Sequence, residues 1–208
     1  MSKMTRKEKD EFFLTAVRDK MAEHGGILKT ADITGLGIDY RRIMKWQDEG
    51  KIFRIKSGYY SMSKEEKPEA EIVAGFFPDG VLTMESALYA YGYIKEQPME
   101  WHIAVDKNTS KSRFKMDYPL VRPYYTEEDV LKVGVTRVSI GNAKFNIYDK
   151  ERLVCDCLKY EDKLDRYILQ KFLRDYISEE DKNIVHLLEY AKYRKVASKV
   201  QNRIGVWL

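Results

Sequence analysis

The residues best suited to binding chemistry are three cations, Arg41, Arg42 and Lys45, within the basic stretch Ile38–Tyr60. At 100° per residue in a helix, these side chains share one quadrant, whereas Ile43 points to the opposite side. Guanidinium groups can fork onto guanine O6 and N7 or onto phosphates, so this face favours contact with nucleic acid. The alternative is a solvated helix whose cations pair with Asp48 and Glu49, which follow Lys45 by three and four residues.

A second group of polar residues follows where the pattern changes from helical to alternating. Arg54 and Lys56 point outward on the first strand of an expected hairpin, and Ser57 stands at its turn. Such a tip could lay positive charge along a phosphate backbone or into a minor groove. Of the next two tyrosines, Tyr59 and Tyr60, we expect one to pack against the helices and the other to lie near the surface, where its hydroxyl could reach a phosphate.

Short helical elements position these residues. The periodicity predicts a helix over residues 6–24, a second that Thr30 caps and Gly35 and Gly37 stop, and a third from an Asp39 cap to Gly50. Lys29 and Thr30 open the second helix, whose free amides could bind a phosphate, although a cap without a ligand is the simpler interpretation. Three helices and a hairpin in this order predict a winged helix-turn-helix over residues 1–64.

The remainder of the chain, residues 65–208, is expected to form a larger α+β domain with a helical C-terminal tail, joined through the polar segment 63–71. Helical spacing occurs over 70–80 and 83–93, β-formers are frequent over 100–107 and 118–125, and two strands are expected around the turn Gly141-Asn142. Two long helices, 150–177 with a break near Asp162 and 178–204, should close the chain. The fold class is therefore α+β.

Charge is unevenly distributed between these two regions. Residues 1–64 hold 14 Lys/Arg against 9 Asp/Glu, whereas residues 65–208 hold 23 against 24. A local basic excess is typical of a nucleic-acid surface, and it can also serve solubility alone.

Several kinds of site have no support in the sequence. The common phosphate-binding, hydrolase and zinc-protease motifs are absent, and the three histidines and the pair Cys155 and Cys157 lack ligand or disulfide spacing. We expect no catalytic residue, no cofactor and no metal. Four carboxylates that could meet around Mg²⁺ remain an open alternative, with Asp149 better explained as a helix N-cap: Glu85, Asp106, Asp149 and Asp156.

No apolar run is long enough to cross a membrane, and the charged N-terminus has no secretory pattern. The expected location is cytoplasmic.

The order of motifs resembles one family. The segment "GIDYRRIMKWQDEGKIFRIKSGYY" is similar to the winged helix of the AbiE-type antitoxins, which are transcriptional regulators of viral defence systems. The later segments "ESALYAYGYI", "WHIAV" and "IYDKERLVCDCL" resemble that family's small-residue helix, its next strand and its Asp-x-Glu-Arg segment. Together these motifs cover nearly the whole chain.

The resemblance implies an antitoxin that represses its own operon by binding double-stranded operator DNA, with inverted repeats and possible self-association on the DNA, and that counteracts a nucleotidyltransferase-like toxin through its second domain. It places DNA reading on Tyr40, Arg41, Arg42 and Lys45, where Tyr40 departs from the small polar residue that the family commonly has, and on the wing. Arg152 matches a recurring family position and is interpreted first as structural. The candidate DNA-binding residues are Lys29, Thr30, Tyr40, Arg41, Arg42, Lys45, Arg54, Lys56, Ser57 and Tyr59.

Three alternatives stay open at this point. The chain could be a general regulator without a toxin. A winged helix can also be a protein-docking module, and the tyrosine-rich second domain suits a protein interface. A nuclease or nucleotidyltransferase activity would need carboxylates clustered in the fold.

Overall fold

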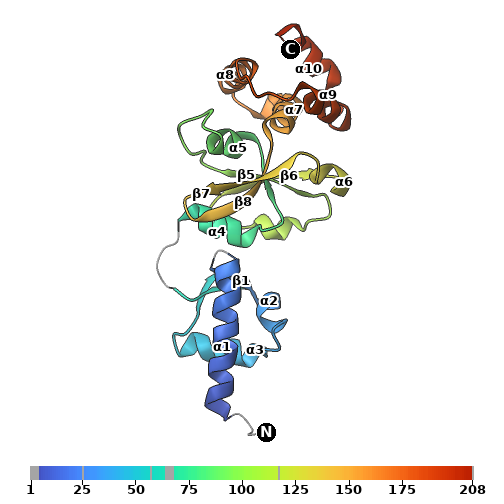
Figure 1. The fold of residues 1–208 in the computed structure, drawn as a ribbon. Helices are drawn as coiled ribbons and strands as arrows, with labels where there is room; N and C mark the ends of the chain where they lie inside the picture. Colours follow the sequence, from blue (N-terminus) through green and yellow to red (C-terminus); the bar gives the residue numbers. More distant parts are fainter. Residues whose placement is uncertain (1–4, 25, 57, 64–67, 117, 208) are drawn as a thin grey trace. The chain divides into compact units, whose positions relative to one another are not determined.

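The protein is α+β, which confirms the expected class, in a computed structural model that describes residues 5–24, 26–56, 58–63, 68–116 and 118–207 (Figure 1). It divides into two compact units. The first comprises residues 1–78 with 141–144, and the second comprises 79–140 with 145–208. The first unit therefore extends past residue 64, where the sequence placed the end of the first domain. Residues 64–67 of the expected linker lie outside the described part.

Helices and a small sheet form the first unit. The sheet has the order β1-β3-β2 with antiparallel pairs, and β1 was not expected from the sequence. The elements in chain order are α1 (Arg6–Glu23), β1 (Ile27–Lys29), α2 (Thr30–Thr34), α3 (Tyr40–Asp48), β2 (Phe53–Lys56), β3 (Tyr59–Ser61) and α4 (Glu69–Phe76).

One hydrophobic cluster joins the first three helices to this sheet. Val17 from α1, Ile33 from α2 and Ile43 from α3 are all fully buried, and Tyr60 from β3 is 1% exposed in the same cluster. The cluster holds the apolar side of α3 against the rest of the unit, because burial of Ile43 and Trp46 removes their side chains from water.

The second unit is built on a five-stranded mixed sheet. Its order is β6-β5-β4-β8-β7, in which β4 runs antiparallel to β5 and parallel to β8, and β5 runs parallel to β6. The strands are β4 (Val81–Leu82), β5 (Trp101–Asp106), β6 (Val121–Thr126), β7 (Val135–Ile140) and β8 (Ala143–Tyr148). The central strand β4 has only two residues, too few to show an alternating pattern in the sequence.

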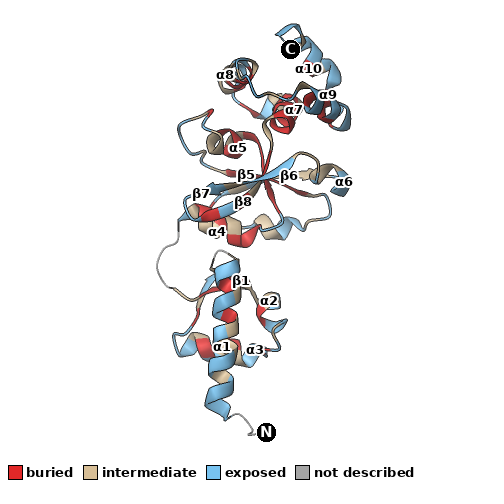
Figure 2. Cartoon of the chain, in the orientation of Figure 1, coloured by how far each residue is buried: buried red, intermediate tan, exposed pale blue. Residues whose placement is uncertain are grey.

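The helices of the second unit gather around α7. All residues from Glu151 to Leu158 are buried in α7, which Figure 2 shows as the most consistently buried helix of the tail. Both cysteines lie here as free, buried thiols, as expected. The helices are α5 (Met84–Ala90), η1 (Lys111–Phe114), α6 (Glu128–Leu131), α7 (Lys150–Lys159), η2 (Glu161–Lys163), α8 (Arg166–Ile177), α9 (Ile184–Tyr193), α10 (Ala197–Ile204) and η3 (Gly205–Trp207).

The closing helices differ in part from the prediction. The break between α7 and α8 near Asp162 is confirmed, but the expected single helix over 178–204 is wrong. It consists of α9 and α10, because Lys195 between them adopts a left-handed backbone with φ 58°. A non-glycine residue rarely adopts a left-handed backbone within a helix, so the helix ends there. Among the described residues, no helix is both long enough and apolar enough to span a bilayer.

Candidate nucleic-acid interface

Local sequence signals define α3 at both ends. The Asp39 side chain accepts a hydrogen bond from the amide of Arg42 at 2.8 Å, which confirms the expected N-cap. Gly50 beyond the C-terminus has φ 67°, a conformation that glycine adopts without strain. Between these ends Ile43 and Trp46 are fully buried, so the other side of α3 faces outward.

The outward side of α3 carries Tyr40, Arg41 and Lys45. Tyr40 is 52% exposed, Arg41 is exposed, and the Lys45 side chain is 48% exposed. No hydrogen bond or ion pair within the described residues engages the Arg41 guanidinium. Lys45 lies 3.2 Å from Glu49, the helical pair that the solvated alternative predicted. Arg41 is therefore the α3 cation most available to an external phosphate or base.

Arg42 has a different position from the one expected. Its guanidinium lies 3.3 Å from the Asp10 carboxylate and 4.9 Å from the centre of the Phe13 ring, both on α1, and its side chain is only 21% exposed. The sequence placed Arg42 in one outward quadrant with Arg41 and Lys45, but in the structure Arg42 lies against α1. Helical periodicity describes α3 alone, so it could not show that α1 covers the Arg42 side of the basic face.

Asp10 of α1 contacts several side chains of α3 and of the segment that follows it. Its carboxylate accepts a hydrogen bond from Trp46 Nε1 at 3.1 Å and lies 3.3 Å from Lys51 Nζ and 4.0 Å from Lys45 Nζ. Burial alone would raise the pKa of Asp10, but the bonds from Trp46 and Lys51 outweigh it and hold that pKa below its ordinary value. Nothing in the sequence marked Asp10, because its partners are more than thirty residues away.

The hairpin meets α3 at the hydroxyl of Tyr60, another residue that the sequence left unassigned. Tyr60 is paired with Arg54 across β3 and β2, and its side chain interacts with those of Tyr40 and Thr30. Burial, followed by the interaction with Tyr40, raises the pKa of Tyr60, and the positive charge of Arg54 opposes that rise. Thr30 of α2, Tyr40 of α3 and Arg54 of β2 therefore all lie near the buried side chain of Tyr60.

The start of α2 is also attached to the hairpin. Thr30 is the first residue of α2 rather than its cap, which corrects the expectation, and Lys29 holds the cap position. The amide and hydroxyl of Thr30 both donate to the carbonyl of Gly58, at 2.8 and 3.2 Å. The Thr30 hydroxyl is thus engaged within the protein, whereas Lys29 is half-buried at the cap.

The remaining hairpin candidates are packed, exposed or undescribed. The Tyr59 ring lies 4.3 Å from that of Phe76 on α4, and Tyr59 is half-buried, so part of its side chain packs within the first unit. Arg54 is exposed on β2. Ser57 and the Lys56 side chain lie outside the described part.

The second unit buries one small cluster of charged side chains. Arg152, Asp156 and Arg194 are all nearly inaccessible, and both guanidinium groups lie against the Asp156 carboxylate, Arg152 at 3.2 Å. Asp149 caps α7 through the amide of Arg152 at 2.8 Å, as expected. Within the described ranges, no three His, Cys, Asp or Glu residues come together as metal ligands, so the four carboxylates considered for Mg²⁺ are not assembled there.

Comparison of the sequence with protein-family models and with curated proteins gave no match.

Proposed function

We propose that the first unit is a winged helix-turn-helix that binds double-stranded DNA, with α3 as the recognition helix and the β2–β3 hairpin as the wing. The observation that carries this proposal is the two-sidedness of α3, which buries Ile43 and Trp46 completely while it exposes Arg41 and Lys45. Arg54 is a further exposed cation on the hairpin. A recognition helix needs such a face, since cations must reach base edges and phosphates while the opposite side holds the helix rigid.

The link between Tyr40 and Tyr60 adds a reason to treat helix and hairpin as one surface. The side chains of Tyr40 in α3 and Tyr60 in β3 interact, so helix and hairpin can follow the same stretch of DNA duplex. On this basis the proposed contacts are Tyr40, Arg41, Lys45 and Arg54. Arg42 is not among these contacts, because its side chain holds α3 against α1.

For the whole chain we propose a cytoplasmic antitoxin of the AbiE type, which represses its own operon and counteracts a nucleotidyltransferase-like toxin through the second unit. The support is the resemblance of the sequence motifs together with the two-sided α3. The proposal gives the chain no catalytic role.

The test is a fluorescence-anisotropy titration of the chain against a duplex from its own upstream region. Arg41→Ala should weaken binding by about 1–3 kcal/mol if Arg41 reads a base, and should lower the salt slope by about one charge if it contacts a phosphate. Arg18→Ala, an exposed arginine on α1, is the matched control. Unchanged affinity and salt slope in Arg41→Ala would remove α3 from the interface.

A protein-docking module is the second candidate, and one observation favours it. Arg42 and Lys45 already have carboxylate partners in Asp10 and Glu49, so part of the positive charge is neutralised within the unit. Binding that barely changes between low and physiological salt would support this alternative, because phosphate contacts lose affinity steeply as salt rises.

A further inference from the structure

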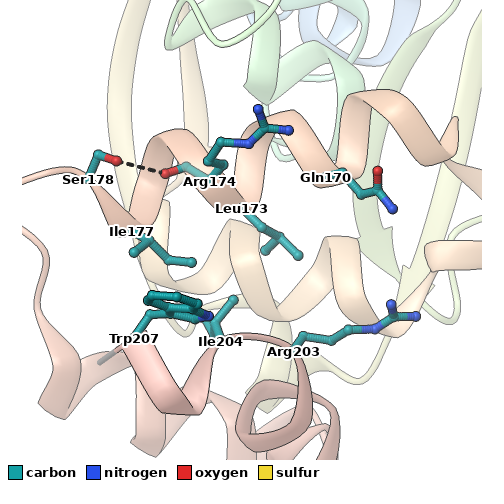
Figure 3. A pocket seen from close by; sticks show the side chains of 8 residues that line it. All are labelled: Gln170, Leu173, Arg174, Ile177, Ser178, Arg203, Ile204 and Trp207. Atoms are coloured by element: carbon teal, nitrogen blue, oxygen red, sulfur yellow. Dashed lines mark hydrogen bonds between the residues drawn. The ribbon is translucent and has the colours of Figure 1, made fainter.

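A hydrophobic groove lies between α8 and the C-terminal turn of the second unit. Its volume is about 450 Å³. Figure 3 shows that Leu173 and Ile177 on α8 face Ile204 and the indole of Trp207 across it. Leu173 and Ile204 are buried and form a fixed floor, whereas Trp207 lies at the edge with 68% of its surface exposed.

The exposure of Trp207 distinguishes it from the other two tryptophans. Trp46 and Trp101 are 0% and 2% exposed and belong to the cores of their units. An indole that large gains most when a partner covers it, and tryptophan and arginine are the residues that most often dominate protein interfaces. Trp207 therefore marks the groove as a surface that a partner can cover.

The charged residues that line the groove indicate the net charge of its partner. The eight lining residues include Arg174 and Arg203 and no carboxylate. Arg203 lies 2.9 Å from Glu161, while the Arg174 guanidinium has no hydrogen bond or ion pair within the described residues. Besides Arg203, the segment 190–207 holds four Lys or Arg and no Asp or Glu, although Arg194 is buried against Asp156 and Lys199 lies 2.8 Å from Glu161. A partner with a carboxylate near Arg174 is attracted, and a basic one is repelled.

Shape identifies the kind of partner. A groove of about 450 Å³ exceeds one side chain and suits the two or three neighbouring apolar anchors that a helix presents at i, i+3 and i+4. The floor offers aliphatic side chains, which do not bind phosphate. We propose that this groove docks an acidic amphipathic helix of a partner protein, with apolar anchors against Leu173 and Trp207 and a carboxylate beside Arg174. The inference holds whether or not the first unit binds DNA.

The test uses the full chain and two synthetic helical peptides of about 15 residues. Both carry leucines at i, i+3 and i+4, with glutamate flanking them in one peptide and lysine in the other. The emission of Trp207 should shift to the blue when the glutamate peptide covers it, since the other tryptophans are already buried. We expect the glutamate peptide to bind about tenfold more tightly than the lysine peptide at low salt.

Charge reversal gives the decisive comparison. Arg174→Glu should abolish or invert the preference for the glutamate peptide, and Trp207→Ala should weaken both peptides. Arg137→Glu on β7, outside the groove, should leave the preference intact. Arg174 and Trp207 are exposed, so these variants should retain their thermal melting temperatures.

Three results would overturn the proposal. One is equal binding of the two peptides in the unaltered chain. Another is an Arg174→Glu variant that keeps the wild-type preference. The last is a Trp207 shift caused by a DNA oligonucleotide or by self-association in sedimentation experiments, without a response to the glutamate peptide.

Discussion

Arg41 in the first unit and Arg152 in the second carry the same guanidinium group in opposite environments. Arg41 is exposed and has no partner in the described residues, whereas Arg152 is 0% exposed and bonded to Asp156 and to the carbonyls of Val130 and Val133. A solvated cation is free to bind an external anion, and a buried cation is held because its removal from water must be compensated inside the protein.

The exposed cations of the first unit and the buried charges around Asp156 in the second unit therefore have different roles. In the first unit cations lie on the surface beside a hairpin, which suits recognition of an external partner. In the second unit Asp156 draws Arg152 of α7 and Arg194 at the end of α9 to one carboxylate, which links these helices. Arg152 also lies 4.2 Å from the centre of the Tyr148 ring, so its charge is further stabilised.

The largest expected effect comes from removing the central carboxylate. Asp156→Asn leaves two buried guanidinium groups without their counter-charge and should lower the free energy of unfolding by about 3–5 kcal/mol. Urea denaturation measures the loss, and Asp162→Asn on the exposed turn is the matched control. A loss below about 1 kcal/mol would show that the buried charges are not coupled as the geometry indicates.

Acid should reveal the same contrast between buried and exposed groups. Burial, followed by the charge of Arg122, lowers the pKa of His102 to about 4. Because this pKa lies below the ordinary value near 6.5, the stabilisation is present above that pH and is lost as pH falls towards 4, by on the order of 3 kcal/mol. Denaturation curves at several pH values should show this loss, and His102→Asn should reduce it.

The exposed His186 provides the control for that experiment. His186→Asn removes an imidazole from the surface, and its denaturation curves are compared with those of His102→Asn. Identical acid dependence in the unaltered chain and in His102→Asn would contradict the assignment of the loss to His102.

A smaller effect should separate Arg42 from its neighbour Arg41. Arg42→Ala removes the contacts to Asp10 and Phe13 and should destabilise the first unit by about 1 kcal/mol. Arg41→Ala should leave the free energy of unfolding within about 0.5 kcal/mol of the original value. Thermal melting of both variants decides the matter, and equal melting temperatures would erase the distinction between a packed and a free arginine.

The smallest effect concerns the pair of Lys45 with Glu49. Glu49→Gln releases both Lys45 and Lys51 from Glu49 and should raise affinity for the upstream duplex about twofold at low salt, if α3 binds DNA. Glu23→Gln, an exposed glutamate of α1, removes the same charge elsewhere. An equal gain in both variants would show that net charge, and not the release of Lys45, sets the affinity.

Local elements were the most predictable part of the fold. The Asp39 and Asp149 caps, the ends of α3 and the strands around Gly141-Asn142 follow from short-range rules that act over a few residues. The elements that escaped prediction are short or depend on distant partners. β4 has two residues and is central only because β5 and β8 flank it, and the end of α9 is set by the backbone at Lys195.

The candidate site shows the same limit. Helical periodicity placed Arg41 and Lys45 outward and Ile43 inward, but it also grouped Arg42 with the free cations. The contact that holds Arg42 against α1 comes from Asp10, and the residue that interacts with both Tyr40 and Thr30 is Tyr60. Such pairings span many residues along the chain, so no local pattern carries them.

The sequence by itself determined the α+β class, the positions of most helices and strands, and the basic excess of the first 64 residues, because these depend on composition and on periods of two and 3.6 residues. Only the tertiary structure decided which charges face water. Arg41 stays exposed while Arg42 lies against α1, and Arg152 is buried against Asp156. Burial depends on what folds over a side chain, and that is a property of the whole packed unit rather than of any segment.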